Sequence, residues 1–155
     1  LMIITILTLG IWFNQERQWG VRLRTEQKKS HQSEVKYQDL YDNAPDMYVS
    51  VDAKTSVILE CNQTLATKLG YTKNDIIGRP IFEMYHPDSL NEAKKKFQSF
   101  VSTGKIDNAE LGLKTKNGRK IDVNLNATAV QDEKGNILYS RSAWRDITDR
   151  KKAED

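Results

Sequence analysis

Residues 60–80 read ECNQTLATKLGYTKNDIIGRP, and they decide the fold because they hold a strand end and two short helices with their stop signals. Asn62 is a good N-cap residue, since its side-chain oxygen can accept from the free amides of a helix that begins at Gln63. The apolar residues of this helix fall on one face: Leu65, Ala66 and Leu69. Gly70 ends it, because glycine adopts the left-handed conformation at little cost.

The second short helix has a stronger start signal. Thr72 and Asp75 have the spacing of a capping box, and Tyr71 and Ile76 occupy the two positions of a hydrophobic staple. Gly78 stops the helix after about one turn. Helices this short are unstable alone, since nucleation costs more than one or two turns return. We therefore expect both helices to pack against a sheet.

The flanking sequence predicts that sheet. Five strands are expected, at residues 47–52, 57–61, 111–116, 119–131 and 137–146. Asn117-Gly118 suits a hairpin turn between the third and fourth strands. The longest helix of the domain begins at His86-Pro87-Asp88 and ends at Gly104. Antiparallel strands with helices grouped between the second and third predict an α+β fold rather than a parallel one.

In this order, the features resemble those of the PAS domain family. They are the helix that follows Asn62, then Leu69-Gly70-Tyr71, the acidic Ile76-Ile77-Gly78 segment and a later Asp146-Ile147-Thr148. The resemblance extends over residues 37–154 and assigns residues 43–148 to the PAS domain. It implies a sensor or signal-relay domain of a signal-transduction protein, with a sensor histidine kinase or a nucleotide cyclase as the type of parent.

The resemblance also gives a role to Asp146, Ile147 and Thr148. In PAS domains this segment leads into a downstream helix and then an effector domain, so we expect signal transmission here and the start of a helical linker in residues 149–155. Asp146 and Thr148 are also residue types that cap helices, so the last strand and the new helix are expected to move as one piece.

Residues 1–13 are nearly unbroken apolar sequence. A bilayer needs about twenty such residues, so we interpret them as the end of a transmembrane helix. Trp12 and Trp19 suit a membrane interface, and the Arg and Lys residues behind them match the positive-inside rule. The domain is then expected on the cytoplasmic side of the membrane. An ordinary packing helix and an interfacial helix are the alternatives.

Residues 14–42 are polar, free of proline and predicted to be helical. Their regular apolar positions are few: Val21, Leu23, Val35, Tyr37, Leu40 and Tyr41. A helix with so little apolar surface needs a partner, and we expect a homodimer through it. A solvated linker helix is the alternative.

The sequence offers little support for catalysis. Cys61 is the only cysteine, which excludes an internal disulfide and a multi-cysteine zinc site, and His31 and His86 are the only histidines. No nucleophile stands beside a base and no phosphate-binding glycine loop is present. The helix around Lys94 lacks aromatic residues that stack on bases, and the net charge is only +3. We expect no enzyme activity, no metal site and no nucleic-acid partner in this chain.

In some PAS domains a cavity between the long helix and the sheet holds heme, flavin or a metabolite. The LOV-type flavin motif Gly-x-Asn-Cys-Arg-Phe has no counterpart, because Gly78-Arg79-Pro80-Ile81-Phe82 places no cysteine there. Only His86 is available for heme, and His-Pro-Asp is a frequent helix start in PAS domains without heme. We predict no bound cofactor.

A small-molecule ligand remains open. The residues expected to line its cavity are Met84, Tyr85, Phe97, Phe100 and Leu125, with a polar contact from Asn124 or Asn126. The alternative is that these aromatic residues fill the core. Two functional hypotheses follow: a PAS sensor or relay domain that couples ligand or membrane-helix input to an effector, and a ligand-free PAS dimerisation or interaction module.

Overall fold

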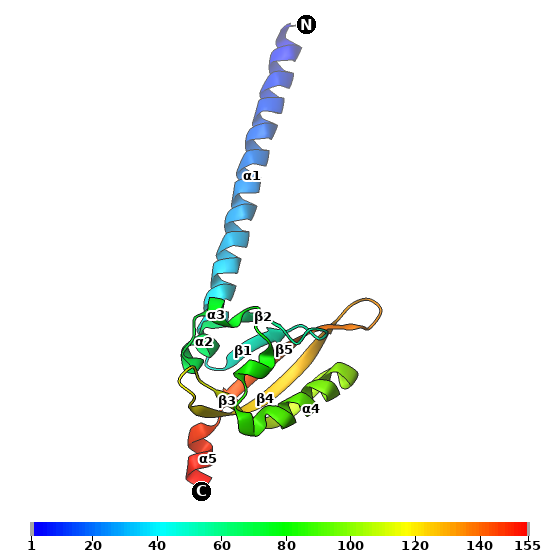
Figure 1. Cartoon of the computed structure of the whole chain (residues 1–155). Coiled ribbons are helices and arrows are strands. Elements are labelled where there is room, and N and C mark those ends of the chain that lie inside the picture. Colours follow the sequence, from blue (N-terminus) through cyan, green and yellow to red (C-terminus); the bar gives the residue numbers. More distant parts are fainter. Residues whose placement is uncertain (1, 155) are drawn as a thin grey trace. The chain divides into compact units, whose positions relative to one another are not determined.

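The computed structural model describes the backbone of residues 2–154 and the side chains of residues 9–154. It divides the chain into a first unit that ends at Leu40 and a second, larger unit that begins at Tyr41 (Figure 1). Helix α1, Met2–Asp42, makes up the first unit and supplies Tyr41 and Asp42 to the second.

Between Leu9 and Leu40 every side chain of α1 is exposed, including Trp12 at 56% and Trp19 at 61%. Among the described residues, no helix has the length and apolar character that a bilayer crossing requires. The side chains of residues 1–8, which form much of the expected membrane segment, lie outside the described part. The assignment of residues 1–13 therefore stays a prediction.

The second unit is built on a five-stranded sheet in the order β2-β1-β5-β4-β3, and every neighbouring pair is antiparallel. The strands are β1 Met47–Val51, β2 Ile58–Cys61, β3 Lys105–Lys114, β4 Lys120–Gln131 and β5 Ile137–Asp146. The helices are α2 Gln63–Leu69, α3 Lys73–Ile76, the 3-10 turn η1 Ile81–Met84, α4 Pro87–Thr103 and α5 Thr148–Glu154. The α+β fold predicted from the sequence is confirmed.

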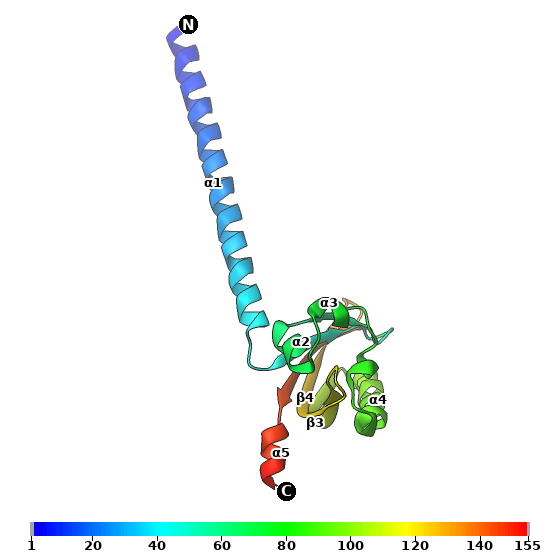
Figure 2. The same cartoon turned by 60° about the vertical axis from the view of Figure 1, so that its left-hand side comes forward.

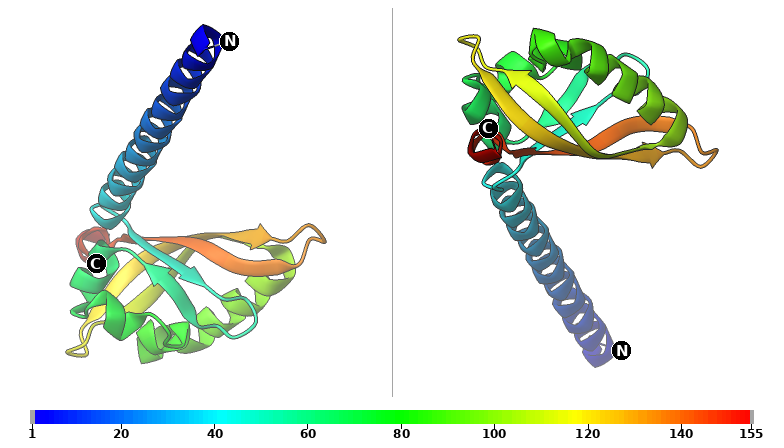
Figure 3. Two further views of the ribbon diagram at one scale, coloured as in Figure 1. Left: turned by 90° about the horizontal axis from the view of Figure 1, so that it is seen from above. Right: turned by 90° about the horizontal axis from the view of Figure 1, so that it is seen from below.

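The helices between β2 and β3 lie on one face of this sheet (Figures 2 and 3). Between that face and the helices lies the core, in which Trp144, Phe100 and Leu65 are at most 1% exposed. The alternation of β4 places its buried residues on the helix side of the sheet: Ile121, Val123, Leu125 and Ala127.

The predicted helix caps are present. Asn62 Oδ1 accepts from the amide of Leu65 at 3.1 Å, and Gly70 ends α2 with a φ of 80°. Thr72 and Asp75 form both hydrogen bonds of the capping box. These local signals fix where α2 and α3 start and stop, and so they fix the position of Asn62.

Strand β3 differs from the prediction, since it begins at Lys105 instead of residue 111. Its pairing with β4 shifts register between Ile106 and Ala109, and Asn108 has a positive φ of 49°. Such a bulge breaks the alternation of apolar and polar residues, so the first half of the strand has no strand-like pattern in the sequence.

Candidate functional site

A small cavity lies in the core beside α4. Its volume is ≈ 30 Å³, which is room for about two water molecules. Four of the predicted lining residues surround it: Tyr85, Phe97, Phe100 and Leu125. The rings pack closely, with Phe97 5.5 Å from Phe82 and 6.3 Å from Phe100 between centroids. In this conformation aromatic side chains fill most of the space that a ligand would take.

The other predicted ligand residues, Met84, Asn124 and Asn126, lie elsewhere. Met84 is fully buried in the core but does not line the cavity. Asn124 is on the opposite face of β4 from Leu125, where its Oδ1 accepts from Asn126 Nδ2 at 2.8 Å. Because neighbouring strand residues point to opposite faces, neither asparagine reaches the cavity.

Sequence reasoning missed the polar lining, which comes from Lys96 of α4 and from β5. Ser140, Ser142 and Trp144 border the cavity, and Trp144 is 1% exposed. Its Nε1 is the one buried side-chain polar atom in the described part of the chain that has no hydrogen-bond partner. Ser140 and Ser142 alternate with Arg141 and Ala143, so the sequence carries no apolar–polar signal that could have found this set.

Tyr85 faces the same region, with its ring centroid 5.7 Å from that of Trp144. Burial raises the pKa of the Tyr85 phenol far above its usual value, so the hydroxyl stays protonated across the physiological range. The cavity is therefore bordered by a phenol that stays neutral and by an indole whose N–H has no partner.

Heme and flavin are both larger than the cavity of ≈ 30 Å³ in this conformation, and the expectation of no bound cofactor stays a prediction. His86 is the N-cap of α4, where its Nδ1 accepts from the amide of Asp88 at 3.4 Å, and it does not border the cavity. Within residues 9–154, no group of three or more His, Cys, Asp or Glu side chains is placed to hold a metal ion.

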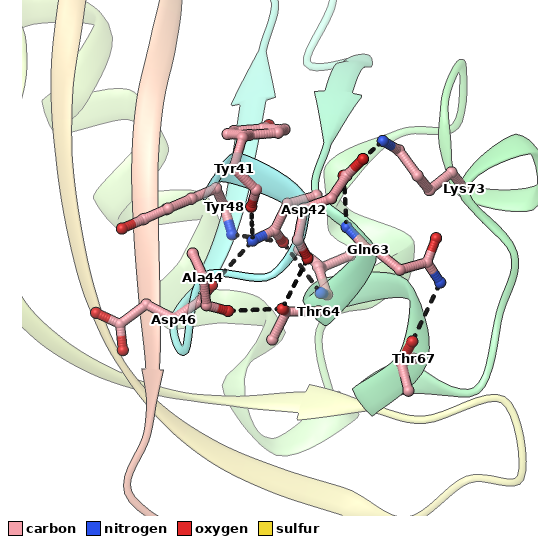
Figure 4. Close-up of polar contacts among 11 residues, drawn as sticks. Tyr41, Asp42, Ala44, Asp46, Tyr48, Gln63, Thr64, Thr67 and Lys73 are labelled. Atoms are coloured by element: carbon pink, nitrogen blue, oxygen red, sulfur yellow. Dashed lines mark hydrogen bonds and ion pairs between the residues drawn. The ribbon is translucent and has the colours of Figure 1, made fainter. Parts of the chain in front are cut away.

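Asn62 is the centre of a polar network that we call the input junction. Its other members are Tyr41, Asp42, Ala44, Asp46 and the first residues of α2, most of which are labelled in Figure 4. Its Nδ2 donates to the carbonyls of Tyr41 and Asp46, both at 3.0 Å. Its Oδ1 accepts from the amide of Tyr48 at 3.0 Å as well as from Leu65. With an exposed fraction of 0%, this amide uses both donors and both acceptor positions.

The Asp42 carboxylate makes further hydrogen bonds at the input junction. Its Oδ1 accepts from the amide of Gln63 at 3.0 Å and from Lys73 Nζ at 2.8 Å. The Thr64 hydroxyl lies 2.6 Å from the carbonyl of Ala44 and 3.2 Å from that of Asp42. The last turn of α1 is thus hydrogen-bonded to the first turn of α2, as Figure 4 shows.

The output junction, Asp146 to Thr148 with its partners, lies where β5 passes into α5. Asp146 Oδ1 accepts from the amide of Thr148 at 3.0 Å, so the helix cap predicted for Asp146 is present. The hydroxyl of Thr148 bonds back to β4 instead, accepting from the amide of Asp122 at 3.1 Å. Ile147 donates its amide to the Asp122 carbonyl at 2.8 Å and buries its side chain. These bonds fasten the start of α5 to the sheet.

Ion pairs also stabilise the output junction. Partial burial by itself would raise the pKa of Asp146, but hydrogen bonds from the Thr148 amide and from Lys68 outweigh it and hold the pKa below its usual value. Lys68 Nζ lies 2.9 Å from Asp146 Oδ2. Further along α5, Arg150 and Lys151 pair with Glu110 on β3, and they lower the pKa of that carboxyl.

An antiparallel five-stranded sheet with helices on one of its faces defines a small α+β domain. The chain belongs to the PAS domain family, because the family model described as PAS domain matches residues 45–149. It is thus a PAS sensor domain of the kind that occurs in signalling proteins such as sensor histidine kinases.

Curated relatives agree with this assignment. The chain is 27% identical over 136 residues to the sensor histidine kinase TmoS of Ectopseudomonas mendocina. It is 26% identical over 123 residues to the methyl sulfide methyltransferase-associated sensor of Methanosarcina acetivorans. These alignments cover 82% and 79% of the chain but only 14% and 12% of the two relatives.

Solved structures share the fold. The PAS domain of an HTR-like protein from Haloarcula marismortui has a TM-score of 0.68 at 22% identity, covering 80% of this chain and 99% of that one. A PAS domain from Colwellia psychrerythraea has a TM-score of 0.67 at 23% identity, with 74% and 97% covered.

Proposed function

We propose that this chain is a signal-relay PAS domain that passes a change in α1 to the helix that starts at α5, and from there to the effector domain of a longer signalling protein. One observation carries the proposal: the last turn of α1 and the first turn of α5 are both fastened by hydrogen bonds to one small domain. A sensor of the histidine kinase type is the parent that the relatives favour.

The relay works as a shift between two populated packings. Input from α1 favours one arrangement of the input junction over the other, and the output junction follows. A nearly filled core supports a relay more than a ligand sensor, since a cavity of ≈ 30 Å³ has no room for a metabolite unless the aromatic side chains move.

The input side is proposed to be a membrane helix. Trp12 and Trp19 are exposed aromatic residues just after the apolar start, and basic residues follow them. This arrangement would place the domain on the cytoplasmic side of the membrane and would make residues 1–13 an anchor.

The proposed partner of α1 is a second copy of itself. Its apolar side chains are exposed along the whole described length, with Val21 at 63%, Val35 at 54% and Leu40 at 64%. If the homodimer forms through α1, the full chain sediments as a dimer and a chain of residues 37–155 sediments as a monomer. The PAS domain of the truncated chain should stay folded, which circular dichroism checks. A truncated chain that stays dimeric would leave α1 without a role in assembly.

The relay itself is tested in the full-length parent protein with Asp146→Ala, read out as regulated effector output. We expect the output to lose its response to input while the domain stays folded, because the first amide of α5 loses its acceptor. Asp149→Ala is the matched control, as it removes an exposed carboxylate three residues further on. Normal regulation in Asp146→Ala would contradict the proposal.

A ligand sensor is the second candidate, and the unpaired Trp144 N–H beside the cavity favours it. A buried donor without a partner is costly and is relieved when an acceptor arrives. An absorption spectrum of the purified protein, with mass spectrometry of the molecules released on denaturation, tests this candidate. A stoichiometric small molecule would support it; an empty protein would favour the relay or the ligand-free dimerisation module.

A further inference from the structure

Two separate connections join the input junction to the output junction. The first is the ion pair between Asp46 and Arg145, with Oδ2 to Nη2 at 3.0 Å and Oδ1 to Nε at 3.2 Å. Both carboxylate oxygens are engaged, so the pair has the fixed two-point geometry of an arginine fork. Asp46 is also the residue whose carbonyl accepts from Asn62, and Arg145 directly precedes Asp146.

Strand register explains why these two residues meet. Met47 pairs with Trp144 across β1 and β5, so Asp46 and Arg145 form the next position of the same antiparallel ladder. Met47 and Trp144 are buried on the helix side, and alternation turns the ion pair toward the other face. The pair therefore lies outside the core at the place where the chain comes into the sheet and leaves it.

Helix α2 is the second connection. It begins at the Asn62 cap, and its last turn carries Lys68, whose ammonium group binds the Asp146 carboxylate at 2.9 Å. The helix is short and held firmly, since Leu65, Ala66 and Leu69 are all 0% exposed. A displacement of its first turn therefore moves its last turn as well.

We propose that these two connections form a closed ring that carries a change at the end of α1 directly to α5, without any change in the core cavity. The ring consists of Asn62, α2, Lys68, Asp146, Arg145 and Asp46. None of these residues borders the cavity. The inference rests on the proposed relay function and specifies its route.

Exposure to solvent limits how strongly the two ion pairs can couple the input junction to the output junction. The Arg145 side chain is 72% exposed and that of Asp46 20%, while Lys68 and Asp146 are 37% and 31% exposed. Ion pairs of this exposure change equilibria by about two- to fivefold, and salt weakens them. A response of this size is measurable by amide hydrogen exchange.

The test perturbs the input junction and observes α5 in the 155-residue chain. Thr64→Val keeps the side-chain shape and removes the hydroxyl between the carbonyls of Ala44 and Asp42. The readout is the Lys151 amide, which donates to the carbonyl of Ile147 at 3.0 Å in the first turn of α5. The amides of β4 report global unfolding, and the exchange rates of Lys151 are compared after they have been corrected for global unfolding. We expect Thr64→Val to speed exchange at Lys151 by about two- to fivefold.

The decisive comparison repeats Thr64→Val in a Lys68→Gln/Arg145→Gln background, which cuts both connections. The effect of Thr64→Val on Lys151 is expected to disappear there. It should persist in an Arg79→Gln background, because Arg79 pairs with Glu83 in a similar exposed ion pair outside the ring. The first connection can be restored by exchanging its charges, with Asp46→Arg and Arg145→Asp combined in the Lys68→Gln background. The effect of Thr64→Val on exchange at Lys151 should then return.

The two ways of failing are distinct. If Thr64→Val speeds exchange at Lys151 equally in the Lys68→Gln/Arg145→Gln background, the ring is not the route, although the relay stands. If neither Thr64→Val nor Asp42→Asn changes exchange at Lys151 in the otherwise native chain, the two junctions do not communicate, and both the route and the proposed relay fail.

Discussion

At the scale of single residues, Asn62 has the most demanding position in the domain. Its side-chain amide donates twice and accepts twice while fully buried, and it joins the end of α1, the start of β1 and the cap of α2. No other side chain offers two donors and an acceptor with two lone pairs at this size. The residue serves stability and the input junction together.

Asn62→Ala should therefore be strongly destabilising. It removes the cap and leaves the carbonyls of Tyr41 and Asp46 without their donor, so we expect the free energy of unfolding to fall by about 2–4 kcal/mol. Urea unfolding followed by circular dichroism measures the change. Asn74→Ala, at an exposed position of α3, is the control and should shift it by less than about 0.5 kcal/mol. Equal effects of the two substitutions would show that the Asn62 network contributes little.

The Asp146 carboxylate gives a pH dependence of known sign. Its pKa is lowered in the folded state, so the ionised form is favoured by folding. Its contribution to stability is complete above the ordinary aspartate pKa of about 3.9 and is lost as the pH falls through the lower folded value. Asp146→Asn should flatten this part of the curve of unfolding free energy against pH. An unchanged curve between about pH 5 and pH 2 would contradict the assignment of the Lys68 and Thr148 contacts.

Prediction from the sequence succeeded at this scale only where the chemistry is local. The cap function of Asn62 follows from its neighbours in the chain, and so does that of Asp146. The other partners of Asn62, Tyr41 and Asp46, are 21 and 16 residues away, and only the folded chain brings them together. Trp144 was not predicted as a cavity residue, because its inward direction depends on the pairing of β5 with β1.

At the scale of elements, the helix stops were the most readable signals. Gly104 ends α4 with a φ of 75°, and its amide donates to the carbonyl of Phe100 at 2.7 Å. A side chain at this position would strain the backbone, and its Cβ would lie 3.3 Å from the Cβ of Ala129 on β4. The stop therefore also sets how closely α4 approaches the sheet.

Gly104→Ala should lower the free energy of unfolding by about 1–3 kcal/mol, the sum of left-handed strain and a tight contact. Gly118→Ala is the matched control, since Gly118 has a φ of 84° but open space where a Cβ would stand. Thermal or urea unfolding compares the two variants. The contact with Ala129 would be unimportant if Gly118→Ala were as destabilising as Gly104→Ala.

Elements without a local signal were predicted less well. The hairpin of β4 and β5 was predicted to within a residue, whereas the first half of β3 was missed because a bulge interrupts the alternation of that strand. The helical lining of the cavity, Phe97 and Phe100, was predicted because the resemblance to PAS domains implies a cavity between the long helix and the sheet. The polar lining was not, since Ser140 and Ser142 look like solvent-facing residues in the sequence alone.

At the scale of the whole molecule, the proposed function makes the domain a connector between two helices. The family and the fold were predicted from the order of short motifs, and both are confirmed. The order of motifs in one domain identifies its fold but not its input, its partner or its effector, because these depend on contacts with other chains and domains. The relatives are far longer than the aligned part, in line with a module that works inside a larger protein.

The relay is tested most directly by measuring effector output in variants of the full-length parent protein. These variants carry one to seven extra residues in α1, inserted between Lys36 and Tyr37. Each inserted residue rotates the helix by about 100°, and seven residues make about two full turns. If α1 drives the domain as a continuous helix, output varies with this period and returns close to its starting level at seven. Output that stays constant, or that changes steadily with the number of inserted residues, would contradict the account.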